Sequence, residues 1–556
     1  MENNTNNASN LIVKIVPNES ENLNIDSLSD RIIKQSKLQS FINSETSSEN
    51  QSGESEKQKI RLLSIEPLLT NTVNSNKNDV LLLKNYIAKY YDYQNNRCLI
   101  VKGEIDNPSS SEIIESNQQP LPTNSEFNHA LTILKQNDEN IGKEIQSGNL
   151  KTYRPMPPIL TDENKDSEIE RTLFIGLQPA NNQSNKSDSS NLRHEIIGVN
   201  MIQKSIMRFD NRAPSNSRAE DSLCGSPDAQ QQTADRGTPG SAKVTISQGD
   251  ILLWEFIVTR PSASLGTNGS AIDFQNIKYK GKRIFARANT PILNVKYDND
   301  ACGPFRDWQW QEGMFEDNGD DVAPGFRLCQ NPAKTILDNG KDQGNFLGVA
   351  VYVVGQEVVF VSELEAGWYR YISQWRFNSN GTIKPRFGFA AVKDSCVCNV
   401  HHHHVYWRFE LDKAENRSEN KVIEEFNDPP LSNSKWTQIK YERKRLRNNN
   451  HKRIWRFKKQ APSDEGYNII SGPNDGVADN FGKGDIWFLK NRQNQFDDGV
   501  AATGPPYESQ IDNFVNHEKI DKDIVIWYGA HFTHDVNHSD ETGHIVGPDL
   551  VPLNLQ

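Results

Sequence analysis

Four consecutive histidines, His401–His404, offer more potential chemistry than any other segment of this sequence. They open a run of strand-like residues, and in a strand alternate side chains share one face. The face of His401 and His403 continues with Val405, Trp407, Phe409 and Leu411, whereas the other face is mostly polar. The alternation predicts that His401 and His403 point into a core. Two imidazoles spaced in this way form a chelate for copper or zinc.

Two further motifs extend the histidine pair. Arg408-Phe-Glu-Leu-Asp412 follows it directly, and a strand-like segment far downstream runs from Trp527-Tyr-Gly-Ala to His534. Together they resemble the catalytic domain of copper amine oxidases, which has a His-x-His strand, an Arg-Leu-Asp-x-Asp stretch and a third histidine downstream. The resemblance implies a copper ion on His401, His403 and His534. His531 is a weaker competitor, because it lies on the opposite strand face from His534.

The resemblance also implies a cofactor made from a tyrosine. The family oxidises the tyrosine of an Asn-Tyr-Asp/Glu motif to topaquinone, and Tyr369 falls on that position. Trp368 replaces the Asn and Arg370 replaces the acid, so the neighbours that orient the quinone differ. Tyr297, in Val295-Lys-Tyr, resembles the tyrosine that hydrogen-bonds the quinone oxygen.

A carboxylate base completes the family's chemistry by removing the α-proton of the substrate. Burial suits a carboxylate to this task by raising its pKa toward neutrality. The family's Phe-Asp-x-Gly-Glu stretch is similar to Met314-Phe-Glu-Asp here, which makes Glu316 the candidate base and Asp317 the alternative. An acidic turn exposed to solvent is an equally good interpretation of this segment.

The sequence also offers a candidate second metal site and two closely spaced cysteines. By resemblance, Glu410, Asp412 and Asp523 correspond to acids that hold a peripheral calcium, and their hard oxygens suit that ion. Glu410 stands where an Asp is usual, so the site is looser or takes sodium, and a solvated acidic strand face explains the same residues. Cys396 and Cys398 fall on the strand face opposite the histidine pair, which indicates packing residues rather than copper ligands.

The composition of the chain divides it into four regions with different predicted structures. Residues 1–78 are rich in Asn, Ser, Glu and Lys, which predicts a largely disordered segment. Residues 79–212 read as a small α+β domain, with Thr123 or Ser125 capping its helix. Residues 213–243 look like a linker. Residues 244–556 alternate apolar and polar residues between Asn, Asp and Gly turns, which predicts a large antiparallel β-sandwich.

Composition excludes several classes of protein. The net charge of −11 argues against nucleic-acid binding, and the sequence contains no run of 18 apolar residues that would span a membrane. The N-terminus lacks the features of a signal peptide, so a cytoplasmic location is expected. Six cysteines in 556 residues do not predict a disulfide framework.

The resulting functional prediction is a copper-dependent oxidase of small primary amines. It would use oxygen and a quinone at Tyr369 and release aldehyde, ammonia and hydrogen peroxide. One alternative is a non-catalytic copper-binding protein on the same scaffold, favoured by the substituted Asn and acid. Another is a copper enzyme with different oxidative chemistry at an unmodified Tyr369 or Trp368. A homodimer is implied by the resemblance.

Overall fold

The structure, a computed structural model, describes most of the chain. The described residues are 11–18, 25–34, 38–39, 60–70, 82–116, 120, 122–154, 170–179, 195–208, 224–226, 232–266, 268–298, 304–394, 396–412, 420–492, 510–535 and 544–555. They belong to two compact units. The larger unit takes its described residues from ranges 1–18, 213–500 and 506–556, and the smaller unit from 19–212.

The larger unit contains two mainly antiparallel sheets in its described part. The first holds the histidine run in its middle and has this strand order: β1 (Leu11–Pro17), β10 (Ser241–Gln248), β11 (Ile251–Thr259), β12 (Asp273–Tyr279), β13 (Lys282–Tyr297), β21 (His401–Leu411), β28 (Ile524–His534), β27 (Ile486–Lys490) and β24 (Arg443–Arg445). A short strand, β14 (Pro304–Arg306), pairs with β13.

The second sheet carries the tyrosine segment. Its order is β15 (Gly319–Ala323), β16 (Phe326–Cys329), β17 (Val349–Val354), β18 (Glu357–Ala366), β19 (Tyr369–Asn378), β20 (Ile383–Ala391), β30 (Asp549–Leu553), β26 (Gly466–Ile470), β25 (Ile454–Lys459), β22 (Lys421–Phe426) and β23 (Trp436–Ile439). A further strand, β29 (His544–Val546), pairs with β20. The pairing of β16 with β17 is parallel, and a short helix, α5 (Ile336–Asn339), precedes β17.

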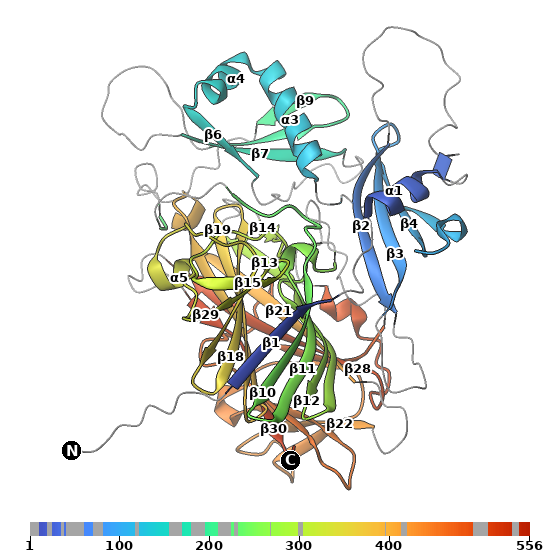
Figure 1. The fold of residues 1–556 in the computed structure, drawn as a ribbon, viewed down its shortest axis with the longest axis vertical. Helices are drawn as coiled ribbons and strands as arrows, with labels where there is room; N and C mark the ends of the chain where they lie inside the picture. Colours follow the sequence, from blue (N-terminus) through green and yellow to red (C-terminus); the bar gives the residue numbers. More distant parts are fainter. Residues whose placement is uncertain are drawn as a thin grey trace, which may run out of the picture. The chain divides into compact units, whose positions relative to one another are not determined.

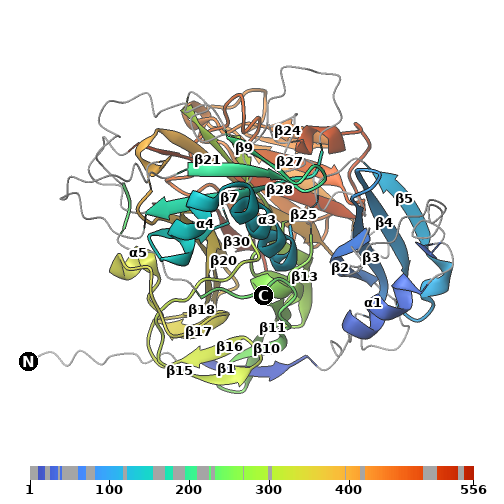
Figure 2. The ribbon, with the colours of Figure 1, turned by 90° about the horizontal axis from the view of Figure 1, so that it is seen from above.

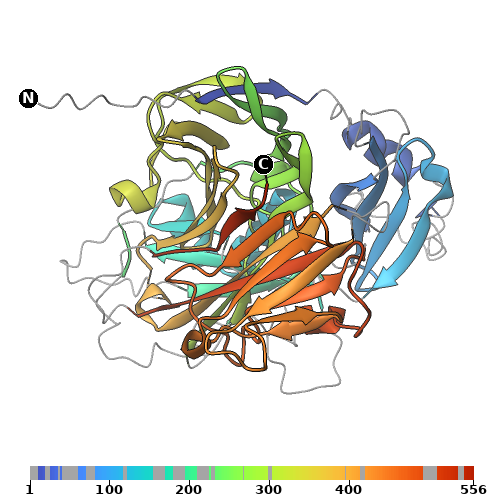
Figure 3. The ribbon, with the colours of Figure 1, turned by 90° about the horizontal axis from the view of Figure 1, so that it is seen from below.

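Aromatic side chains pack between the two sheets, whose ribbons are drawn in Figure 1. Phe256 of β11 stacks on Phe377 of β19 with ring centroids 4.6 Å apart, and Phe274 of β12 contacts Trp375 at 5.1 Å. Burial of such rings is the main source of stability for a sandwich. Figure 3 shows the orange and red strands of the C-terminal part lying side by side in this unit. The predicted β-sandwich is therefore present.

The smaller unit is α+β, as predicted. One sheet consists of β2 (Ile60–Thr70), β3 (Leu82–Asp92), β4 (Arg97–Glu104) and β5 (Glu112–Ser116), and α1 (Ile25–Ile33) packs on it. The other consists of β6 (Leu150–Tyr153), β7 (Thr172–Pro179), β8 (Glu195–Asn200) and β9 (Ser205–Arg208), covered by α3 (Asn124–Asn137) and α4 (Glu139–Gln146). Thr123 caps α3 through a capping box with Glu126.

The described parts of the N-terminal segment, residues 1–78, contain regular structure. β1, α1 and β2 all lie within residues 1–78, and β1 pairs along its length with β10, from Leu11 opposite Gln248 to Pro17 opposite Ala242 (Figure 2). An apolar segment as short as LIVKIV is stabilised here by a sheet edge more than 200 residues away in sequence. The other parts of residues 1–78 lie outside the described residues.

Candidate metal and tyrosine site

Strand register decides which histidines meet. β21 pairs with β28 so that His401 stands opposite His534 and His403 opposite Phe532. Directly opposed residues of an antiparallel pair share one face, so His401, His403 and His534 lie together on the face turned toward β19. His401 and His403 are fully buried. The three ring centroids are close, with 5.0 Å between His401 and His403 and 4.7 Å between His401 and His534.

Tyr369, the first residue of β19, extends from the second sheet into this group. Its hydroxyl forms a short hydrogen bond with His401 Nε2 and a 2.7 Å hydrogen bond with His534 Nδ1. Its ring centroid is 4.5 Å from that of His403. The side chain is fully buried. Tyr369 therefore lies among the three imidazoles, with its ring directed inward between the sheets.

The three imidazoles are neutral and partly unpartnered. His401 Nδ1 donates to the Asn399 carbonyl at 2.6 Å, which leaves Nε2 with its lone pair toward Tyr369. Neither ring nitrogen of His403 has a hydrogen-bond partner, an unusual state for a buried polar group. Burial holds the pKa of His401 and His403 well below the usual range and lowers that of His534 to about 4.

Neutral imidazole is the form that binds metals, so the donor chemistry fits copper or zinc. In the described part of the chain, however, no three His, Cys, Asp or Glu side chains are gathered closely enough to hold an ion as they stand. The Tyr369 hydroxyl joins His401 and His534 at the point where the nitrogens of those rings meet. A metal bound here would have to displace or bind that oxygen.

Tyr297 and Trp368 line the same group. The Trp368 indole donates to the Tyr297 hydroxyl at 2.7 Å, and the Tyr297 ring stacks on His401 with centroids 4.4 Å apart. Arg370 behaves differently, because alternation in β19 turns it to the other face of the strand. There it forms a two-point ion pair with Asp342 at 2.8 and 3.0 Å. Its guanidinium therefore does not lie on the Tyr369 ring.

A carboxyl that the sequence analysis missed lies beside the tyrosine. Asp307 follows β14 directly and is fully buried. The Tyr371 hydroxyl donates to its Oδ2 in a short hydrogen bond, and the Tyr371 ring stacks on Tyr369 at 5.3 Å. Burial raises the pKa of Asp307 to about 8. One signal was present in the sequence: a lone acid in the aromatic run Phe305-Arg-Asp-Trp308 suggests a buried carboxyl.

The two predicted bases have other partners. The Glu316 main chain pairs with that of Lys334, and its carboxyl accepts from Gln343 at 3.3 Å. Asp317 accepts from Arg327 at 2.9 Å and its side chain is buried. Among the described contacts, neither carboxyl joins the group around Tyr369. Asp307 is instead the carboxyl that contacts this group, through the Tyr371 hydroxyl.

The three acids of the predicted calcium site also have protein partners. Glu410 accepts from Arg408 at 3.0 Å, and Asp412 forms an ion pair with Arg283. Asp523 accepts from Asn491 at 3.2 Å. Arginines thus neutralise two of the three carboxylates in this arrangement, which fits the interpretation as an acidic strand face better than a calcium cage.

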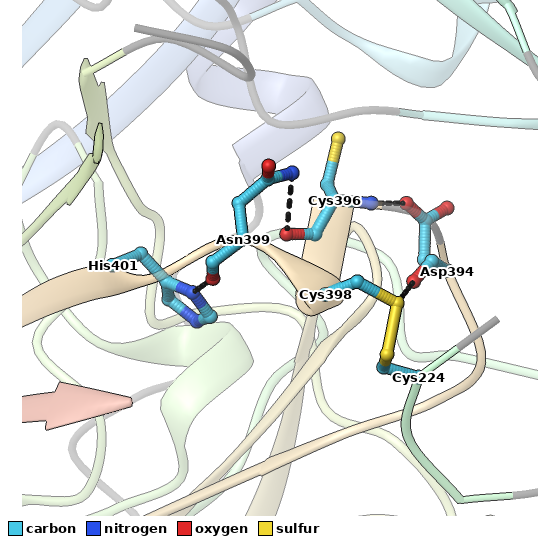
Figure 4. Close-up of a disulfide and its surroundings, with 6 residues drawn as sticks. All are labelled: Cys224, Asp394, Cys396, Cys398, Asn399 and His401. Atoms are coloured by element: carbon cyan, nitrogen blue, oxygen red, sulfur yellow. Dashed lines mark hydrogen bonds between the residues drawn. A yellow bond between two sulfur atoms is a disulfide. The ribbon is translucent and has the colours of Figure 1, made fainter. Parts of the chain in front are cut away.

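The turn before β21 is held by a disulfide, contrary to the expectation for Cys396 and Cys398. These residues form a short 3₁₀ turn rather than strand. Cys398 is bonded to Cys224, with Cα atoms 5.2 Å apart, and Cys396 is also disulfide-bonded. Figure 4 shows the turn leading through Asn399, whose carbonyl accepts from His401. Sequence spacing does not reveal a bridge between residues 174 positions apart.

The comparisons with known proteins concern the fold alone. No protein-family model matches the sequence, and no curated protein matches it. Among solved structures, a copper-containing benzylamine oxidase from Hansenula polymorpha matches with a TM-score of 0.57 and 12% identity, over 90% of this chain and 94% of that one. A lysyl oxidase from Pichia pastoris matches with a TM-score of 0.53 and 12% identity, over 89% and 85%. The chain has the fold of copper amine oxidases.

In the described residues, no helix is long and apolar enough to cross a membrane. The described residues also contain a disulfide between Cys224 and Cys398.

Proposed function

We propose that this protein is a copper-dependent oxidase of small primary amines. The observation that carries the proposal is the position of Tyr369, whose hydroxyl contacts His401 and His534 beside the unpartnered imidazole of His403. A tyrosine in contact with three neutral imidazoles is placed for oxidation by a metal ion that those imidazoles bind. The fold, shared with two amine oxidases of known structure, supports the same proposal.

When bound, copper on His401, His403 and His534, together with a quinone made from Tyr369, would supply the electron acceptor for the amine. The chain's own residues do the rest. Asp307 is the base that takes the proton from the carbon next to the amine nitrogen. Its buried carboxyl, with a pKa near 8, is basic enough for this step yet ionised in an appreciable fraction near neutrality. Tyr371 orients the carboxyl through its hydroxyl.

Tyr297 and Trp368 support the imidazole of His401. The Trp368 indole fixes the Tyr297 ring through their hydrogen bond, and the Tyr297 ring in turn stacks on the His401 imidazole and limits its rotation. Deep burial of these rings excludes water from the reacting atoms. Amine and molecular oxygen are the proposed substrates. Calcium at Glu410, Asp412 and Asp523 and a homodimer remain predictions from the resemblance.

One observation favours a second candidate, a copper-binding protein without catalysis. Trp368 replaces the Asn of the family motif, and its indole is hydrogen-bonded to Tyr297. The replacement of the motif acid by Arg370 places a cation on the opposite strand face, paired with Asp342. A chain that kept the histidines but lost quinone formation would have this pattern.

One experiment separates the two candidates. The protein is loaded anaerobically with one equivalent of Cu²⁺, exposed to air, and followed by visible absorption before and after phenylhydrazine. The oxidase proposal expects a broad quinone band that phenylhydrazine shifts. It expects no band in Tyr369→Phe and an unchanged band in Tyr406→Phe, whose hydroxyl bonds the Gly482 carbonyl on the other face of the sheet. Bound copper without any band would leave the non-catalytic protein.

A further inference from the structure

A second pair of histidines lies on the outer face of the same two strands. His404 of β21 stands directly opposite His531 of β28, and their Nδ1 atoms are 2.8 Å apart. The two side chains are 1% and 5% exposed. This pair takes no part in the site around Tyr369, which lies across the sheet.

The outer nitrogen of His531 lies next to a carboxylate. His531 Nε2 lies 2.9 Å from Asp485 Oδ1, and Arg447 fixes that carboxyl through Nη1 at 3.0 Å and its main-chain N–H at 2.6 Å. His531 Nε2 and the Asp485 oxygen are close without forming a hydrogen bond. With the Nε2 proton on this side, Nδ1 of His531 would present its lone pair to His404. A carboxylate behind an imidazole is the arrangement that orients metal-binding histidines.

His404 has a weaker version of the same arrangement. Its Nε2 lies 3.5 Å from Asp479 Oδ2, and the other Asp479 oxygen accepts from the main-chain N–H groups of Phe481 and Gly482 at 2.8 and 2.6 Å. If His404 also turns its proton toward a carboxylate, two lone pairs face each other across 2.8 Å. Either a proton on one Nδ1, as in an ordinary hydrogen bond between imidazoles, or a metal ion between the two Nδ1 atoms resolves that contact.

The distance between the two Nδ1 atoms is close to the distance that a shared metal ion requires. Two nitrogens bound to a tetrahedral Zn²⁺ at about 2.0 Å stand about 3.2 Å apart, so the pair would open by a few tenths of an ångström. Gly482 packs closely against this atom, since a Cβ there would lie 2.4 Å from His404 Nδ1, so an ion must enter from the other side of the pair. The half-exposed side chain of Asp479 connects the pair with solvent.

An independent observation also points to a ligand. Asn294 of β13 stands directly opposite His404 and shares its face. Its side chain is 1% exposed, and neither its amide oxygen nor its amide nitrogen has a partner. An unsatisfied buried amide costs about 1–3 kcal/mol, which a bound ion or its water would relieve. The site described above does not use Asn294.

We propose that His404 and His531 bind a divalent transition-metal ion of the Zn²⁺ class through their Nδ1 atoms, with oxygen from Asn294 or Asp479 completing the coordination. Two imidazoles and one or two oxygens form a donor set that such ions prefer. Asp479 supplies the net negative charge, since Arg447 already neutralises Asp485. Lys296 acts on His404 with the opposite sign and limits the affinity. The oxygen ligands must move to reach the ion.

Zinc binding to the metal-free protein tests this proposal separately from the copper chemistry. The His403→Gln variant removes an inner ligand, and equilibrium dialysis against Zn²⁺ with metal analysis then reports the outer pair. We expect one zinc per chain in this background and its loss on adding His531→Gln. Adding His402→Gln, a half-buried neighbour bonded to Thr533, should change nothing. Equal zinc content with and without His531, or equal loss with His402→Gln, would overturn the proposal.

Two further measurements cover the case in which His531→Gln fails to fold. Asp479→Asn changes a half-exposed side chain and should weaken zinc binding about 10-fold or more in the same background. Crystals of the unaltered protein soaked in Zn²⁺ should show an anomalous peak about 2.0 Å from both Nδ1 atoms. A peak only at the inner histidines, or at neither group, would exclude the outer site. Neither result depends on whether the protein oxidises amines.

Discussion

Both faces of β21 carry histidines, but the histidines of the two faces have different neighbours. On the inner face, His401 and His403 lie against Tyr369, and their partners are a main-chain carbonyl or none. On the outer face, His404 and His531 stand between the carboxylates Asp479 and Asp485. The comparison teaches that the neighbours of an imidazole, rather than its presence in a motif, decide which nitrogen is available and for what chemistry.

The largest effect is expected from the inner face. His403→Ala removes one of three copper ligands, and we expect the copper affinity of the inner site to fall by more than about 100-fold. Copper titration with a competing chelator measures this. His402→Ala is the matched control, since this side chain lies on the outer face beside Thr533. A larger loss in the control would mean that the strand is shifted by one residue.

The next largest effect concerns Asp307. Asp307→Asn keeps the shape but removes the base, so kcat for amine oxidation should fall about 10²–10⁴-fold while the quinone band is retained. Glu316→Gln and Asp317→Asn serve as controls and should lower kcat much less. Steady-state assays of peroxide release provide the measurement. A collapse in Glu316→Gln with an active Asp307→Asn would restore the base predicted from the sequence.

A moderate effect is expected from the disulfide. The double variant Cys224→Ser/Cys398→Ser should lower the free energy of unfolding by about 2–5 kcal/mol, measured by chemical denaturation. It should also weaken copper at the inner face, because the tethered turn carries the Asn399 carbonyl that orients His401. Zinc at the outer pair should be unaffected. Equal loss at both faces would show that the bridge stabilises the whole sheet rather than one histidine.

The smallest effect should be a displaced pH profile. Asp307 must be ionised to accept a proton, and burial raises its pKa to about 8, so kcat/KM should rise as pH rises through about 8. The Tyr371 hydrogen bond favours the ionised carboxylate and lowers this pKa. Tyr371→Phe should therefore move the midpoint to higher pH, whereas Tyr406→Phe on the outer face should not. An unchanged midpoint in Tyr371→Phe would mean that Asp307 is not the group whose ionisation sets the pH dependence of kcat/KM.

The sequence predicts the sandwich and the inner histidine face because both depend on local alternation. Val405, Trp407 and Phe409 mark the apolar face of β21, which lies toward the second sheet. The same argument separates His531 from His534 on β28. Both predictions follow from the two-residue period of a strand alone.

The features that sequence reasoning missed depend on contacts between distant segments. Asp307 becomes the buried carboxyl through Tyr371, a residue on the opposite sheet. Glu316 and Asp317 were favoured because an adjacent Phe resembles a motif, although their partners are Lys334 and Arg327. Cys398 was assigned to a strand face, whereas its bridge to Cys224 belongs to a turn. No local pattern encodes such pairings.

The bridge between Cys224 and Cys398 has a topological consequence. It closes the backbone from 224 to 398 into a covalent ring that contains β10 to β20, and therefore Tyr369, Asp307 and Tyr297. His401 and His534 lie on the tail that leaves this ring. A single backbone cut inside the ring leaves both fragments joined, so a nicked chain migrates as one species until thiols are added. Tyr369 therefore lies inside the disulfide-closed ring and the histidines lie outside it. The ring closes at Cys398, three residues before His401.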